Sequence, residues 1–76
     1  MTNERRDQLL FDLKLAFHGA DHFTARLLSL MLKADYSNLA KLAKGFPDEA
    51  ELIEDWKTGK IDPSEVESQH LDTIKR

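Results

Sequence analysis

Apolar residues recur along most of the chain at spacings of three and four, the period of an α-helix that packs one side on a core. Glycine and proline divide this pattern into segments. Gly19, Gly45 and Gly59 each follow a periodic stretch, and Pro47 and Pro63 each open the next one. No stretch alternates apolar and polar residues as a β-strand does. The pattern predicts an all-α fold in which each glycine ends a helix with positive φ.

The predicted fold is a small bundle of four main helices with an optional short fifth helix at the C-terminus. The four helices are expected at residues 4–17, 22–34, 36–44 and 47–58, with Thr2 or Asn3, Asp21 and Asp35 as N-caps of the first three. The fifth begins with Asp62, Pro63 and Glu65, which form a capping box. We expect one domain over residues 1–61 and a short helix or frayed acidic tail over 62–76.

Two of these helices carry more apolar residues than one core face requires. In the first helix the core side is Leu9, Leu10, Leu13, Ala16 and Phe17. In the second helix it is Phe23, Leu27, Leu30, Met31 and Ala34. Phe11 and Leu15 then point to the opposite side of the first helix, and Leu28 and Leu32 widen the apolar arc of the second. These four residues, together with the single tryptophan Trp56, are the candidate protein interface, and they predict a homo-oligomer. The alternatives are scattered exposed hydrophobes and a second helix at the centre of the bundle.

Charge and composition narrow the classes of function. The net charge is −3, and the acids concentrate late in the chain: residues 1–45 hold seven Lys/Arg and five Asp/Glu, against four and nine in residues 46–76. This balance makes nucleic acid an unlikely partner. There is no cysteine, and no apolar stretch approaches the ~20 residues that cross a bilayer. We therefore expect a cytoplasmic protein that does not enter a membrane.

The densest group of like charges predicts an acidic partner surface. It comprises Asp48, Glu51, Glu54 and Asp55, with Glu49 among them. Such a group can dock on a positively charged protein surface, including one that otherwise holds nucleic acid. Acids in a first helical turn also simply complement the helix dipole, so the structural interpretation stays open for each of them.

No residue constellation specifies a chemistry. The chain has no nucleophile elbow, phosphate-binding loop or zinc-protease motif, so neither catalysis nor a cofactor is expected. His18 and His22 have the i, i+4 spacing of zinc ligands, but Gly19 lies between them and ends the helix, so no metal site is expected. Lys41 and Lys44 on the third helix leave a helix-turn-helix DNA-binding regulator as a further alternative.

Residues 33–50, followed by Trp56 and residues 57–60, resemble a pattern in small uncharacterised all-helical proteins of bacteriophages and mobile elements. The resemblance covers the middle third of the chain. It implies an accessory protein in the host cytoplasm, most simply an anti-defence inhibitor that occupies the surface of a host defence protein, for example a CRISPR-Cas-like one. The competing hypothesis is a homo-oligomeric sponge for a small nucleotide signal. Its candidate ligand-binding residues are Arg5, Arg6, Arg26, Lys33 and Tyr36.

Overall fold

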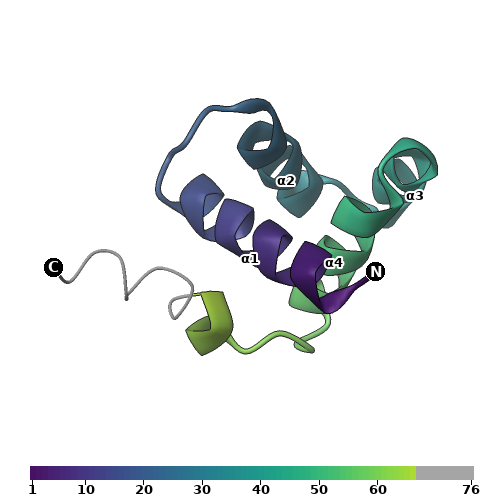
Figure 1. The fold of residues 1–76 in the computed structure, drawn as a ribbon. Coiled ribbons are helices and arrows are strands. Elements are labelled where there is room, and N and C mark those ends of the chain that lie inside the picture. Colours follow the sequence, from purple (N-terminus) through teal and green to yellow (C-terminus); the bar gives the residue numbers. More distant parts are fainter. Residues whose placement is uncertain (67–76) are drawn as a thin grey trace, which may run out of the picture.

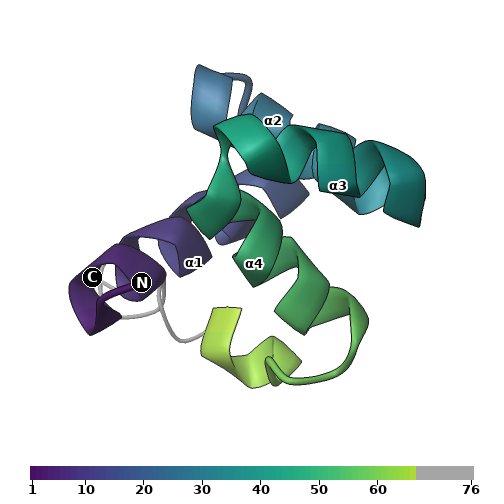
Figure 2. The same ribbon diagram turned by 90° about the vertical axis from the view of Figure 1, so that its right-hand side faces the viewer.

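The computed structural model describes residues 1–66 and confirms the all-α fold. Helices α1 (Asn3–Phe17), α2 (Phe23–Lys33), α3 (Tyr36–Gly45) and α4 (Pro47–Lys57) follow one another through short connections, and a helical turn begins at residue 63. Helix α2 packs on α1 and α4, whereas α3 rests mainly on α4 (Figure 1). Viewed from the side, α3 lies across the front of α2 at the edge of the bundle (Figure 2). Its outer side is therefore open to contact.

The helix ends follow from local hydrogen bonding. The Thr2 hydroxyl accepts a hydrogen bond from the Arg5 amide (3.1 Å), and the Asp35 carboxylate accepts one from the Asn38 amide (2.8 Å), as expected of N-caps. Gly19 has φ +85° and Gly59 has φ +79°. Each ends its helix in a Schellman motif, in which the next amide reaches back to the third-last helical carbonyl.

Two predictions about helix ends are wrong. Asp21 does not cap α2, because the helix starts one residue later and His22 occupies the N-cap position without a side-chain bond to the helix. Gly45 remains inside α3 without positive φ. Its place as the break between helices is taken by Phe46, whose non-helical backbone (φ −134°, ψ 67°) joins α3 to α4.

The core lies where α1, α2 and α4 meet. Its fully covered side chains include the following residues: Leu9, Leu10, Leu13, Leu28, Met31, Leu52 and Ile53. Leu39 is the buried contribution of α3. Because α2 lies against both α1 and α4, two sides of this apolar helix are covered.

The segment after α4 also reaches this core. Ile61 and Val66 are each 3% exposed, and the capping box forms as predicted, with the Glu65 carboxylate accepting from the Asp62 amide (3.0 Å). The same carboxylate binds Arg6 of α1 at 3.3 Å. The start of the predicted tail, residues 62–66, is therefore docked on α1. The rest of that prediction, residues 67–76, lies outside the described part of the chain.

Candidate functional site

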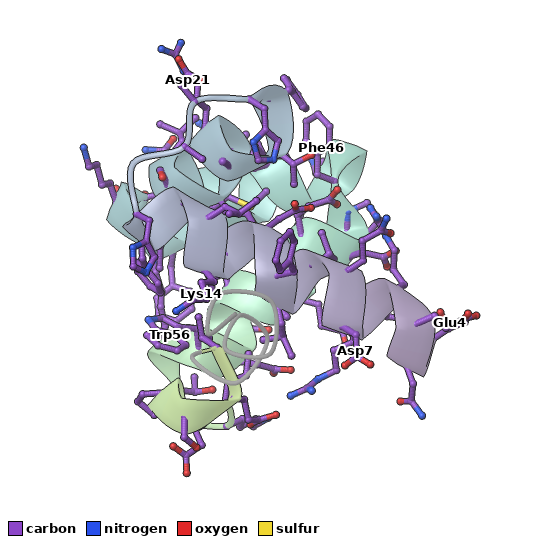
Figure 3. All side chains as sticks on the ribbon, turned by 60° about the vertical axis from the view of Figure 1, so that its left-hand side comes forward. Glu4, Asp7, Lys14, Asp21, Phe46 and Trp56 are labelled. Atoms are coloured by element: carbon purple, nitrogen blue, oxygen red, sulfur yellow. The ribbon has the colours of Figure 1, made fainter. Side chains whose placement is uncertain are left out.

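The residues predicted as one interface do not form a single face. Leu28 is completely buried between α1, α2 and α4, so the prediction that it joins an outer surface is wrong. Leu32 also packs against the core. Phe11 is 39% exposed, and Leu15 on the same helix is half-buried. Trp56 is half-buried and packs against Phe17 at the end of α1, with the two rings 5.2 Å apart. It lies at the opposite end of the molecule from Phe46, which joins α3 to α4 (Figure 3).

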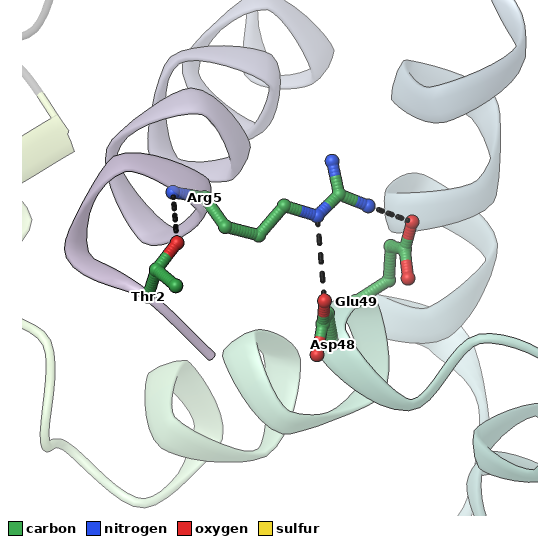
Figure 4. A network of polar contacts seen from close by, with 4 residues as sticks. All are labelled: Thr2, Arg5, Asp48 and Glu49. Carbon is green, nitrogen blue, oxygen red and sulfur yellow. Dashed lines mark hydrogen bonds and ion pairs between the residues drawn. The ribbon is translucent and has the colours of Figure 1, made fainter.

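Part of the predicted acidic surface is taken up inside the fold. The Arg5 guanidinium of α1 binds the Asp48 carboxylate at 3.4 Å and that of Glu49 at 2.9 Å (Figure 4). The Glu49 side chain is only 11% exposed, so this contact joins the start of α1 to the start of α4. Among residues 1–66, Glu51 and Glu54 have no ion-pair partner, and both are exposed. Asp55 likewise has no ion-pair partner among these residues, but it is half-buried. Glu51 and Glu54 are therefore the exposed acids of α4 that remain available to a partner.

The structure does not bring together the residues predicted to bind a nucleotide. Arg5 is held at the start of α4, and Arg6 is held by Glu65. Arg26 and Lys33 are exposed on α2, whereas Tyr36 faces a different groove on the other side of α3. Two of the five candidate groups are therefore already neutralised by carboxylates, which removes the charge that a phosphate ligand would use.

Sequence reasoning misplaced two of the three most exposed large apolar side chains among residues 1–66, and it named the third, Tyr36, only as a candidate ligand-binding residue. Phe23 is 67% exposed, Leu30 is 55% exposed and Tyr36 is 71% exposed. Phe23 and Leu30 were predicted to face the core, but in α2 the inward positions are taken by Ala25 and Leu28. The only signal in the sequence that Phe23 and Leu30 are exposed was that apolar residues cover most of the circumference of α2. This coverage shows that something must remain exposed, but not which residues.

Leu30 and Tyr36 line two open grooves, one on each side of α3, whereas Phe23 lines neither. The groove between α2 and α3 has a volume of about 370 Å³. We call it the basic groove, lined by Leu30, Lys33, Ala34, Asn38, Lys41 and Leu42. The groove between α3 and α4 has a volume of about 350 Å³. We call it the acidic groove, where Tyr36, Leu39, Ala43 and Ala50 form an apolar lining beside Glu51 and Glu54.

Contacts at both ends hold the basic groove in shape. At one end, the ring of Phe23 at the start of α2 lies 5.9 Å from that of Phe46 after α3, so the two helices run in opposite directions. At the other end, the Lys57 ammonium of α4 donates to the Ala34 carbonyl at 2.6 Å. Four exposed cations lie along α2 and α3, and none has an ion-pair partner within residues 1–66: Arg26, Lys33, Lys41 and Lys44.

Two further findings concern metals and membranes. Within the described residues, no three histidine or acidic side chains gather closely enough to hold a metal ion. His22 instead faces Asp12 at 3.4 Å. Nor does any helix in residues 1–66 combine the length and apolar character that a bilayer span requires.

The chain was compared with protein-family models, curated proteins and solved structures, and nothing in these three comparisons matches it.

Proposed function

We propose that this chain is a non-enzymatic accessory protein that acts by occupying a surface of another protein, and that the acidic groove is the part that contacts this partner. The observation that carries the proposal is Tyr36. Its side chain is 71% exposed at an apolar groove, beside the unpaired carboxylates of Glu51 and Glu54. A large amphipathic side chain next to a hollow is the arrangement found at the energetic centre of protein interfaces.

The chemistry of the groove defines the partner. Alanine and leucine side chains of α3 and α4 give an apolar floor, which favours an apolar side chain of the partner. Carboxylates at the edge favour lysine or arginine around that side chain, and they speed encounter with a positively charged protein. The partner is therefore a protein with an apolar anchor set in a basic surface.

The phage-type resemblance of residues 33–50 supplies the biological context for this chemistry. Proteins that bind nucleic acid carry basic surfaces of the required kind. A small acidic protein seated on such a surface excludes the phosphate backbone by occupying the same cations. On this basis we propose that the function is inhibition of a host defence protein, of which a CRISPR-Cas-like nuclease is one example.

A quantitative pull-down from host lysate tests the proposal. Tagged wild-type chain is compared with Tyr36→Ser and with the double variant Glu51→Lys/Glu54→Lys. The control is Glu4→Lys/Asp7→Lys, which makes the same charge change at exposed acids near the start of α1 (Figure 3). We expect wild type and control to retain the same basic protein and both groove variants to lose it. Retention of that protein by the groove variants contradicts the proposal, as does the absence of any protein specific to wild type.

A further inference from the structure

Helix α3 separates two grooves whose charges are opposite and whose volumes are alike. The basic groove has Lys33 and Lys41 at its edges and the exposed Leu30 within it. The acidic groove has Glu51 and Glu54 at its edge and the exposed Tyr36 within it. Their volumes are about 370 and 350 Å³, and residues of α3 line both. The lysines of the basic groove can therefore pair with the carboxylates of an acidic groove on a second copy.

The unpaired state of these charges makes the match informative. Elsewhere in the described chain, some opposite charges pair within one molecule: Arg5 binds Asp48 and Glu49, and Arg6 binds Glu65. Exposed acids such as Glu4 and Asp7 have no ion-pair partner within residues 1–66, so it is the arrangement of the charges around α3 in two grooves that matters. Lys33 and Lys41 line the groove on one side of α3, and Glu51 and Glu54 line the groove on the other side. Lys44 lines neither groove, and none of these five charges pairs with another within residues 1–66. The one acid at the turn into α3, Asp35, is engaged in capping that helix. The charges of the two grooves are therefore solvated in the single chain and free to pair with those of another molecule.

Symmetry decides how a second copy fits. A twofold axis parallel to α3 turns the outer face of one copy onto the same face of the other and exchanges the two sides of the helix. Each basic groove then lies opposite the partner copy's acidic groove, in two equivalent places. An axis in the same plane but perpendicular to α3 would set basic against basic and is excluded by repulsion.

We propose that this chain forms a closed homodimer through α3, with the two helices parallel and each basic groove facing the acidic groove of the second copy. Leu30 and Tyr36 become buried at these two junctions. The exposed rim charges contribute mainly register and specificity, and the apolar side chains contribute most of the affinity. This inference goes beyond the proposed function. Because the dimer covers Tyr36, self-association and partner binding exclude one another.

Charge-swapped variants test the dimer. The variant Lys33→Glu/Lys41→Glu carries two acidic grooves, and Glu51→Lys/Glu54→Lys carries two basic grooves. Each therefore repels itself while complementing the other at both junctions. The purified proteins are measured alone and mixed by light scattering and sedimentation, from about 1 µM to about 1 mM. The reference masses are the 8.7 kDa monomer and twice that value. Far-ultraviolet circular dichroism confirms that each variant is folded, and the single variants Lys41→Glu and Glu51→Lys replace any double variant that is not.

We expect the wild-type chain to dimerise reversibly and more weakly as salt is raised. Each swapped variant should associate at least about tenfold more weakly. Their equimolar mixture should regain the dimer mass, and Glu4→Lys/Asp7→Lys should behave as wild type. A wild-type monomer at about 1 mM overturns the proposal. Swapped variants that dimerise normally, a mixture that stays monomeric, or growth into open assemblies also overturn it.

The dimer and the proposed function fail in different ways. Partner capture is measured at a concentration where the chain is monomeric, and the variant Lys33→Glu/Lys41→Glu leaves the acidic groove unchanged. This variant should capture the basic partner as well as wild type does. If it captures the partner while wild type never dimerises, only the dimer is refuted. If wild type dimerises and neither chain captures a protein, only the proposed function is refuted.

Discussion

Two leucines of α2, two residues apart, allow a matched test of which side of this helix the core uses. Leu28 is completely buried and belongs to the core cluster, whereas Leu30 is 55% exposed. Truncation of a fully buried leucine to alanine removes its transfer free energy and leaves a cavity, which together cost about 2–5 kcal/mol. Full burial of a leucine is worth about 1.5–3 kcal/mol, so Leu30, less than half covered, should contribute under about 1 kcal/mol.

The two variants should therefore differ strongly in stability. A chain of this length is expected to be stable by about 4–11 kcal/mol, so Leu28→Ala removes a large part of the total and Leu30→Ala only a small part. Urea denaturation of dilute monomer, followed by far-ultraviolet circular dichroism, measures both free energies of unfolding. Equal losses, or a larger loss for Leu30→Ala, would refute the assignment of Leu28 to the core and Leu30 to the basic groove.

Three further predictions concern the glycines at the helix ends, the ion pair of Arg5 with Glu49, and the capping box that begins at Asp62. Gly19→Ala should lower the free energy of unfolding by about 1 kcal/mol because an L-residue is strained at φ +85°. Gly45→Ala in helical α3 should raise it by about 0.5–1 kcal/mol. Denaturation midpoints that shift in the same direction from wild type in both variants contradict this prediction. Arg5→Met should lower the free energy of unfolding by about 1–2 kcal/mol, and a double-mutant cycle with Glu49→Gln should be non-additive; additive losses would show that the 2.9 Å contact contributes nothing. Hydrogen bonds from the Ser64 amide and, to a smaller extent, from the Ser64 side chain lower the pKa of Asp62. The contribution of Asp62 to stability is therefore present above the unfolded-state pKa of about 3.9 and is lost as pH falls through the lower folded-state pKa. Titration of the Asp62 carboxyl followed by NMR measures this pKa, and a midpoint at or above the unfolded-state value contradicts the prediction.

The helices could be predicted because their ends are encoded locally. The Asp35 cap and the two Schellman glycines depend on residues within one turn, and each forms as expected. The four-helix order follows from these signals. Gly45 shows their limit, because a proline and a phenylalanine after it end the helix without any need for positive φ.

Only part of the candidate site could be predicted. The cluster of acids in the sequence named Glu51 and Glu54, but the apolar residues beside them are selected by tertiary contacts. In α2 the apolar residues cover most of the circumference, so periodicity cannot fix the rotation of the helix. The packing of α1 and α4 against α2 buries Ala25 and Leu28 and leaves Phe23 and Leu30 outside. The pairing of Arg5 with acids more than forty residues away is likewise invisible locally, and it removes Asp48 from the predicted partner surface.

The central claim is that the outer side of α3, with the groove on each flank, is where this chain contacts other molecules. The most direct measurement is the set of backbone amide shifts in ¹H–¹⁵N NMR spectra recorded across a dilution series. The account predicts concentration-dependent shifts confined to α3, the end of α2 around Leu30, and the exposed face of α4 at Glu51 and Glu54. Shifts centred instead on Phe11 and Leu15 of α1 would contradict this claim. Spectra that do not change with concentration would refute self-association through this surface.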